Sequence, residues 1–374
     1  MQFKKYLVTL IIGTRPEAIK LSTLIKKFQS HNSFNARVVL TGQHKELVEQ
    51  VFDIFDIKAD HNLNLMTERQ TLNYITTKTI EGIEKELKKN RPNLVIVQGD
   101  TTTAFAGALA SFYEKIPVGH VEAGLRTDNI YDPFPEEVNR RIITQFATLH
   151  FAPTKTSKDN ILKSGIKNEV FLTGNTVIDA LLMLSKDIQK LKLLNNQSND
   201  FRFILLTIHR RENRGEKLKD IAKGILLIIE KFEDVKFLVP MHPNPQVKKP
   251  LIEYLGNNPK VLLCKPLNYL DIISAMKHCY FIMTDSGGIQ EEAPSLDKPV
   301  LVLRDTTERP EGLESGTAKL VGTKPEKILS EAEKLLSDNE TYKKMSNAVN
   351  PFGDGKSSER IVEACLKKLN TRFN

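Results

Sequence analysis

The chain alternates between short apolar runs and longer segments whose apolar positions have helical spacing. The first half has six such runs, rich in leucine or β-branched residues and with little polar alternation, at residues 6–13, 36–42, 93–100, 116–122, 148–154 and 169–174. Runs of this kind are typical of strands buried on both faces, as in a parallel sheet covered by helices. The pattern therefore predicts a parallel α/β unit.

The same alternation of apolar runs and helical segments resumes after a polar, leucine-spaced stretch at 181–200. This stretch is the best candidate for a linker. Six further apolar runs then follow, at residues 201–209, 235–242, 260–264, 280–285, 298–305 and 318–322. Two series of this kind predict an α/β fold of two Rossmann-like parallel-sheet domains that face a central cleft. We place the domains at 1–176 and 177–356, and expect an amphipathic helix opened by a serine cap at 357–374.

Composition narrows the possible partners. Charged residues make up 27% and hydrophobic ones 40%, which is ordinary for a soluble globular protein. The net charge of +8 would suit nucleic acid or an anionic substrate. Lysines interleaved with glutamates, as at 81–93, predict solvated helix faces instead, so we expect no nucleic-acid partner.

The chain offers little sign of export, membrane insertion or cofactor binding. The apolar run near the N-terminus is short and reads as a buried first strand, and no run is long enough to span a bilayer. Cys264, Cys279 and Cys365 have neither metal nor redox spacing, which predicts reduced thiols in the cytoplasm. The glycine patterns typical of dinucleotide and ATP sites are missing, and no metal motif occurs.

Charged side chains follow several predicted strands of the first half. Arg15 and Lys20 follow the first strand, Asp100 the third and Glu122 the fourth. Ligands of open parallel sheets bind outside the carboxyl ends of the strands, so these groups are candidates for one site. Each also has a structural alternative: Arg15 could pair with a local carboxylate, and Asp100 could cap the next helix unless the adjacent threonines do so. Glu136 opens a predicted helix, where acids are favoured in any case.

The predicted strands of the second half end in the same way. His209 and His242 each follow a strand, and Asp285 with Ser286 follows another. The basic cluster after His209 suits a phosphate, although a surface turn would explain it equally. At 286–288 a Ser-Gly-Gly turn meets a predicted helix, whose backbone N–H groups can cradle a diphosphate, and Glu292 one turn later can accept hydrogen bonds from a ribose diol. Phosphate and ribose together indicate a nucleotide.

The motifs together resemble the non-hydrolysing UDP-N-acetylglucosamine 2-epimerases nearly end to end. The stretches that carry the resemblance are GTRPEAIK, QGDTTTAFAGALASFY, IPVGHVEAGLRT, PFPEEVNRR, FLTGNTVIDALL, HRREN, DSGGIQEEAPSLDKPVLVLRDTTERPE and NPFGDG. The resemblance implies a GT-B-type fold whose last helix packs back on the first domain. It implies interconversion of UDP-GlcNAc and UDP-ManNAc without a metal or redox cofactor, a homodimer, and a supply of UDP-ManNAc for surface polysaccharide.

The resemblance also assigns roles to residues. The implied catalytic residues are Asp100, Glu122, Glu136 and His209. The implied substrate-binding residues are Arg15, Lys20, Arg140, His242, Leu267, Ile272, Ser286, Gly287, Gly288, Glu292 and Arg309. Contacts to a second UDP-GlcNAc that acts as an activator are implied for Gln43, His44, Arg69 and Arg210. The chain departs from its relatives at Thr23, Ile208 and Ile272, and the last change weakens the assignment of the uracil contact.

Several functions remain open at this stage. A GT-B glycosyltransferase would share the nucleotide half of the site but needs an acceptor. A hydrolysing epimerase would release free N-acetylmannosamine, and a sugar-nucleotide sensor would bind without turnover. The substrate could also be a modified UDP-sugar, and the residues do not say which acid serves which face of the sugar.

Overall fold

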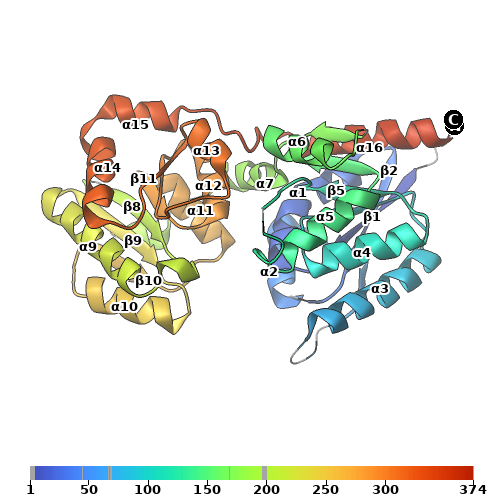
Figure 1. Cartoon of the computed structure of the whole chain (residues 1–374), viewed down its shortest axis with the longest axis horizontal. Coiled ribbons are helices and arrows are strands. Elements are labelled where there is room, and N and C mark those ends of the chain that lie inside the picture. The colour runs from blue at the N-terminus through green and yellow to red at the C-terminus, as the bar shows by residue number, and fades with distance from the viewer. Residues whose placement is uncertain are drawn as a thin grey trace. The chain divides into compact units, whose positions relative to one another are not determined.

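The computed structural model describes residues 5–43, 45–65, 67, 70–127, 129–167, 169–195 and 200–373. The chain divides into two compact units. The first unit comprises Met1–Ala180 with Phe352–Asn374, and the second comprises Leu181–Pro351 (Figure 1). Each unit is built on its own parallel sheet, which confirms the predicted α/β class with two parallel-sheet domains.

The sheet of the first unit has seven parallel strands in the order β3-β2-β1-β4-β5-β6-β7. The strands are β1 (Tyr6–Ile12), β2 (Phe34–Leu40), β3 (His61–Asn62), β4 (Leu94–Gln98), β5 (Val118–Val121), β6 (Leu149–Ala152) and β7 (Val170–Leu172). Its helices are α1 (Arg15–Ser30), α2 (Lys45–Phe55), α3 (Leu72–Lys89), α4 (Thr102–Tyr113), α5 (Glu136–Phe146), α6 (Lys155–Lys163) and α16 (Ser357–Phe373), and α7 (Thr176–Ser185) runs from this unit into the second. The six strands predicted here all form, and β3 is an addition of two residues.

The sheet of the second unit has six parallel strands in the order β10-β9-β8-β11-β12-β13. The strands are β8 (Arg202–Thr207), β9 (Val235–Pro240), β10 (Val261–Cys264), β11 (Phe281–Thr284), β12 (Val300–Val302) and β13 (Ala318–Leu320), which matches all six predicted runs. The helices are α8 (Lys192–Asn195), η1 (Arg211–Asn213), α9 (Glu216–Lys231), α10 (Pro245–Leu255), α11 (Tyr269–His278), α12 (Gly287–Glu292), η2 (Ala293–Leu296), α13 (Pro310–Glu314), α14 (Pro325–Ser337) and α15 (Asn339–Ser346).

Each sheet has a point where the strand order reverses, and that point locates a candidate site. In the first unit β1 pairs with both β2 and β4, and in the second β8 pairs with both β9 and β11. Helices that leave neighbouring strands in opposite directions open a crevice at the carboxyl ends of these central strands. The loops after β1 and β4, and those after β8 and β11, therefore carry the side chains of interest.

The last helix belongs to the first unit, as the resemblance implies. Helix α16 packs on α1, where Thr23 and Ser358 share a hydrogen bond of 3.0 Å. Its first N–H groups, at Ser357 and Ser358, donate to the carboxylate of Asp179 at 3.2 and 2.7 Å. An acid from α7 therefore caps this helix. The expected serine cap is thus replaced by a carboxylate from another helix.

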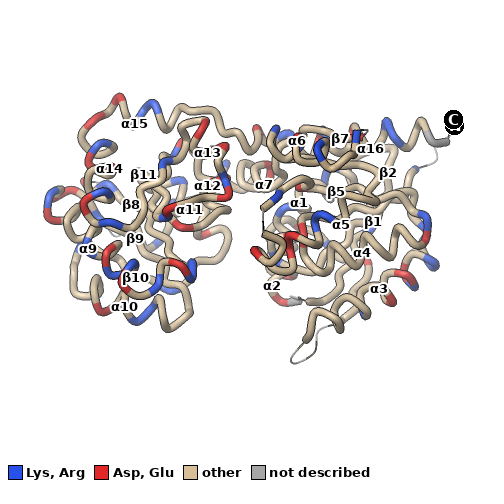
Figure 2. The backbone as a smooth tube through the Cα atoms, viewed as in Figure 1, with Lys and Arg blue, Asp and Glu red and all other residues tan. Residues whose placement is uncertain are grey.

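Basic and acidic positions are interspersed along the helices, as the colouring of the backbone in Figure 2 shows. On α3, which contains most of the lysine-rich run at 81–93, Lys78 pairs with Glu81 at 2.8 Å and Lys88 pairs with Glu84. These side chains are all exposed, which agrees with a solvated helix face. In the described part of the chain, no helix has both the length and the apolar character required to cross a bilayer.

Candidate functional site

Glu17 organises the loop after β1. Its carboxylate is completely buried and accepts hydrogen bonds from the N–H groups of Gly13 and Thr14 at 3.0 and 2.6 Å. It also accepts the hydroxyl of Thr101 at 2.7 Å, so it ties the loop after β1 to the loop after β4. Burial raises the pKa of Glu17, and these hydrogen bonds oppose the rise. Sequence reasoning missed this residue, although Thr-x-x-Glu at 14–17 is a capping-box pattern that could have flagged it.

Arg15 begins helix α1 beside this loop, at the position the sequence predicts. Its side chain is partly exposed, and no carboxylate among the described residues pairs with it. The structural alternative, a local ion pair, is therefore not found there. A cation at the first turn of a helix favours an anionic ligand, because the helix terminus also presents N–H donors.

Glu122 is held by donors from helix α1, strand β4 and the loop before α7. The ammonium of Lys20 contacts both of its oxygens at 2.7 and 2.5 Å, and the side-chain amide of Gln98 donates to it as well. The amide of Asn175 reaches it at 3.4 Å. Glu122 lies in the left-handed region at φ 61°, a conformation that costs energy for a residue other than glycine and often marks a functional position. Gln98 and Asn175 were not expected, since amides at strand ends give no distinct sequence signal.

Asp100 follows β4 and pairs with Arg140 of α5, whose guanidinium lies 2.8 Å from the carboxylate. Asn139 of the same helix donates to the carbonyl of Asp100 at 2.8 Å. Helix α4 is capped by Thr101, whose hydroxyl accepts the N–H of Ala104 at 3.0 Å. The capping alternative for Asp100 is therefore wrong, and its carboxyl is available for another purpose.

The surroundings of Asp100 change its acidity. Burial raises its pKa to about 6, Arg140 opposes the rise, and the negative charge of Glu122 adds to it. A carboxyl with a pKa near neutral pH can both accept and donate a proton. The two carboxyl groups follow neighbouring strands, as the sequence predicts, and the charge of Glu122 acts on the pKa of Asp100.

The two glutamates that open α5 have different surroundings. Glu137 is fully buried and binds Arg141 at 2.6 Å and the N–H of Thr127 at 3.0 Å. Glu136 is only partly buried, and its charge contributes to the raised pKa of Asp100. Glu137 therefore holds the helix in place, while Glu136 is close enough to Asp100 for its charge to act on the pKa of that carboxyl.

His120 of β5 is a further residue that sequence reasoning left without a role. It is fully buried, and its Nε2 lies 2.7 Å from the carbonyl oxygen of Gly99, so this nitrogen carries the proton and donates. Burial lowers the pKa of His120 to about 3, and the ring stays neutral at physiological pH. Gly99 has a φ of 69°, which glycine adopts without strain, and it directly precedes Asp100.

In the second unit, Asp285 fixes the orientation of His209. The carboxylate of Asp285 is completely buried and lies 2.9 Å from Nδ1 of His209. It also accepts the backbone N–H of Arg210 at 2.9 Å and the amide of Asn213 at 3.0 Å. Burial alone would raise the pKa of Asp285, but the hydrogen bonds from His209 and Arg210 outweigh it and lower the pKa. The ring of His209 stacks on that of His242 with centroids 6.3 Å apart.

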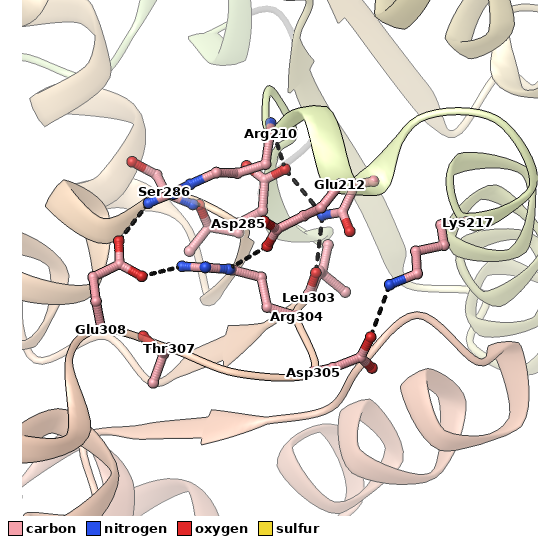
Figure 3. Close-up of polar contacts among 12 residues, drawn as sticks. Arg210, Glu212, Lys217, Asp285, Ser286, Leu303, Arg304, Asp305, Thr307 and Glu308 are labelled. Carbon is pink, nitrogen blue, oxygen red and sulfur yellow. Dashed lines mark hydrogen bonds and ion pairs between the residues drawn. The ribbon is translucent and has the colours of Figure 1, made fainter. Parts of the chain in front are cut away.

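An ion-pair network surrounds the start of helix α12 (Figure 3). Glu308 accepts from the guanidinium groups of both Arg210 and Arg304, and Arg304 binds Glu212 at 2.6 Å as well. Burial would raise the pKa of Glu308, but these arginines lower it to about 2, so the group is a carboxylate at neutral pH. Arg309 pairs with Glu291 of α12.

The Ser-Gly-Gly turn is placed as the sequence predicts, with α12 beginning at Gly287. A β-carbon on Gly287 would lie 3.0 Å from Oε1 of Glu308, so a larger residue does not fit without a shift. Glu292 lies one turn beyond, and its Oε2 is 3.4 Å from the hydroxyl of Tyr269. Leu267 precedes α11 and Ile272 lies on it, and both are partly buried.

The residues implied for an activator are placed only in part. Gln43 accepts a hydrogen bond from Thr103 at 3.1 Å, and Arg210 is paired with Glu308. His44 and Arg69 lie outside the described residues. Within the described part of the chain, no group of three or more His, Cys, Asp or Glu side chains has the geometry of a metal site.

Comparison with known proteins identifies the family. The sequence pattern of the UDP-N-acetylglucosamine 2-epimerase family matches residues 26–366. A UDP-N-acetylglucosamine 2-epimerase of Bacillus subtilis is 50% identical over 364 residues, which cover 97% of this chain and 96% of the relative. The structure of the Neisseria meningitidis UDP-GlcNAc 2-epimerase bound to UDP-GlcNAc aligns with a TM-score of 0.86 at 46% identity, covering 96% of this chain and all of that one.

A more distant relative has the same fold. The Methanocaldococcus jannaschii UDP-GlcNAc 2-epimerase, solved in complex with UDP-GlcNAc and UDP, aligns with a TM-score of 0.77 at 38% identity over 96% of this chain and 99% of that one. The matches span nearly the whole chain in sequence and in structure. The chain therefore belongs to the UDP-N-acetylglucosamine 2-epimerase family.

Proposed function

We propose that this protein is a non-hydrolysing UDP-N-acetylglucosamine 2-epimerase, an isomerase that interconverts UDP-GlcNAc and UDP-ManNAc. The observation that carries the proposal is the pair of carboxyl groups on adjacent strands, Asp100 and Glu122, each with its own cationic partner and with the pKa of Asp100 raised to about 6. Family membership favours this activity over a GT-B glycosyltransferase.

Carboxyl groups alone cannot remove the proton from carbon 2 of the sugar. The hydrogen on carbon 2 of the sugar has no adjacent carbonyl, so a carboxylate with an ordinary pKa of about 4 cannot simply remove it. The bond from carbon 1 to the oxygen of UDP must break with or before the proton transfer, and its electron pair leaves with UDP. Loss of the proton from carbon 2 then gives a glycal, and addition of a proton to the opposite face followed by return of UDP gives the epimer.

Residues of both units would take part in this reaction, each in a different step. Asp100, Glu122 and Glu136 of the first unit would transfer protons at carbon 2, and Arg15 would contact the departing diphosphate. Lys20, Gln98 and Asn175 hold the carboxylate of Glu122 in one orientation, which is what a group that must reach one face of a ring needs.

The second unit would bind the nucleotide. His209, held by Asp285, would donate to the developing charge on UDP, and the Ser-Gly-Gly turn would cradle the diphosphate. Glu292 would accept from the ribose hydroxyls, with His242, Leu267 and Ile272 near the rest of the nucleotide and Arg309 and Arg140 as further contacts. The reactive glycal must be kept from water, so the enzyme would close during turnover.

We extend the proposal to features that rest on the family resemblance. A second UDP-GlcNAc would act as an activator through Gln43, His44, Arg69 and Arg210, and the active form would be a homodimer. The enzyme would act in the cytoplasm, where its three free thiols stay reduced, and would supply UDP-ManNAc for surface polysaccharide.

Incubation of the purified protein with UDP-GlcNAc alone, followed by proton NMR, tests the proposal. We expect UDP-ManNAc to appear with no acceptor present, until an equilibrium mixture of the two UDP-sugars is reached. Release of free N-acetylmannosamine would indicate a hydrolysing epimerase, and an unchanged substrate would contradict epimerase activity altogether.

A further inference from the structure

The carboxylate of Glu308 lies where the proposed function puts a phosphate. A β-carbon placed on Gly287 would lie 3.0 Å from Oε1 of Glu308, so the carboxylate stands directly beside this glycine. The same point lies 3.6 Å from Nη2 of Arg210 and 3.9 Å from Nη2 of Arg309. Figure 3 shows the Glu308 carboxylate between the guanidinium groups of Arg210 and Arg304.

This arrangement is that of an anion-binding site in which the Glu308 carboxylate takes the place of a ligand. Guanidinium groups bind carboxylates and phosphates with the same donor geometry, so either anion satisfies them. The pKa of Glu308 is lowered to about 2, against burial, by Arg304 and Arg210, which means that a full negative charge occupies the site at neutral pH. A diphosphate and this carboxylate cannot both lie here, because like charges at contact distance repel strongly.

The contacts also show how the Glu308 side chain could move away from the arginines at a small cost in free energy. Arg304 has a second carboxylate partner, Glu212 at 2.6 Å, and stays paired when Glu308 moves. The segment around Glu308 remains anchored, since the hydroxyl of Thr307 donates to Gln290 of α12 at 2.8 Å. Glu308 itself is about one third exposed, with 31% of its side-chain surface accessible, so the side chain can rotate toward solvent without disturbing the core.

We propose that Glu308 is an internal counter-anion that fills the diphosphate cradle of the unliganded protein and is displaced by the phosphates of the substrate. The displacement frees Arg210 to bind phosphate, and its cost lowers the affinity of the site for a ligand that carries a diphosphate. Glu308 would therefore lower the affinity for UDP and leave the affinity for uncharged nucleosides unaltered. This inference rests on the proposed function, because it takes a uridine diphosphate as the ligand.

Calorimetric titration of UDP into the whole protein and into Glu308→Gln tests the inference. Glutamine keeps the size of the side chain and removes its charge. We expect the variant to bind UDP about 5- to 10-fold more tightly, which corresponds to about 1 kcal/mol, and to bind uridine with unchanged affinity. The KM for UDP-GlcNAc should fall in parallel.

A matched control comes from the same loop. Asp305 pairs with Lys217 at 2.8 Å and makes no contact with the Gly287 turn (Figure 3), so Asp305→Asn should bind UDP as the wild type does. If Glu308→Gln unfolds, Glu308→Asp serves instead. That variant withdraws the carboxylate by one methylene, and UDP should bind it more tightly than it binds the wild type, by a smaller factor.

The outcomes separate this inference from the proposed function. Unchanged or weaker UDP binding by the Glu308 variants would overturn the inference, because it would mean that Glu308 orients the arginines for phosphate instead of competing with it. Equal tightening of UDP and uridine would also overturn it. A wild-type protein that binds no UDP would overturn the proposed function itself.

Discussion

Asp100 and Glu122 are carboxyl groups at the ends of adjacent strands, yet their surroundings differ. Glu122 is contacted by an ammonium and two amides, and all three donate to its oxygens. Asp100 has one guanidinium partner and a pKa raised to about 6 by burial. Two carboxyl groups with unequal environments are a common basis for acid and base roles within one site.

Replacement of Asp100 by Asn should abolish most turnover without loss of the nucleotide. Asparagine keeps the shape and can still accept a hydrogen bond from Arg140, but it cannot take up a proton. We expect kcat to fall by about 10²- to 10⁴-fold, while the Kd for UDP stays within about twofold. Full activity of Asp100→Asn in steady-state assays would remove Asp100 from the mechanism, and turnover loss with binding retained would exclude a pure sensor.

The raised pKa of Asp100 also predicts a pH dependence of stability. Because the folded-state pKa is about 6 and the ordinary value is 3.8, the folded protein holds this proton more tightly than the unfolded chain does. The carboxyl is therefore neutral in both states below pH about 4 and costs stability progressively as the pH rises to about 6, beyond which the cost is constant.

Urea unfolding of the wild type and of Asp100→Asn, followed by circular dichroism, measures this cost. The advantage of the variant should be small at pH 4 and should grow to the order of 1–3 kcal/mol by pH 7. A difference that does not change between these pH values would contradict the raised pKa. Asp305→Asn, at an exposed carboxyl group, is the control.

At the scale of elements, two candidate side chains come from strand β5 and the residue that follows it, and they contact different partners. Glu122 follows its end, and His120 within it donates to the carbonyl of Gly99. Because Gly99 directly precedes Asp100, His120 is a positioning residue for the loop after β4. It acts without direct contact to the Asp100 carboxyl.

Substitution of His120 should therefore change kcat more than KM. We expect His120→Leu, which removes the donor, to lower kcat by about 10- to 100-fold through misplacement of Asp100. His120→Gln retains an N–H donor and should recover most of the rate, a rescue that a simple packing role would not produce. Equal kinetics for the two variants would contradict the positioning role.

The alternation of strands and helices along the chain could be predicted from the sequence, because buried parallel strands leave continuous apolar runs. The two-residue strand β3 could not, since it has no apolar pattern of its own. The serine cap expected for α16 was wrong because the capping group, Asp179, comes from a helix far away in sequence. A contact of that kind depends on tertiary packing, which periodicity does not encode.

In the candidate site, too, residues with a local sequence signal were predictable and residues defined by tertiary contacts were not. Positions at strand ends, such as Asp100 and Glu122, were predicted because a strand end is a local feature of the sequence. The supporting side chains Gln98, Asn175 and Glu308 were not, because their importance lies in which distant group they contact. Sequence could name the candidate groups, and only the structure could supply the residues that orient or neutralise them.

At the scale of the whole molecule, both units present charged loops at the point where strand order reverses. The first offers carboxyl groups with cationic partners, and the second offers a glycine turn surrounded by arginines. One nucleotide sugar needs both kinds of group, acids for its ring and donors for its diphosphate. The central claim of the account is that such a substrate exchanges the proton on carbon 2.

Reaction in heavy water tests that claim most directly. The protein is incubated with UDP-GlcNAc in deuterium oxide, and the UDP-ManNAc that forms is examined by NMR and mass spectrometry. The account predicts one deuterium at carbon 2 of the product, because the proton leaves to a carboxylate and is replaced from solvent on the opposite face. Product that retains its original hydrogen at carbon 2 would contradict it.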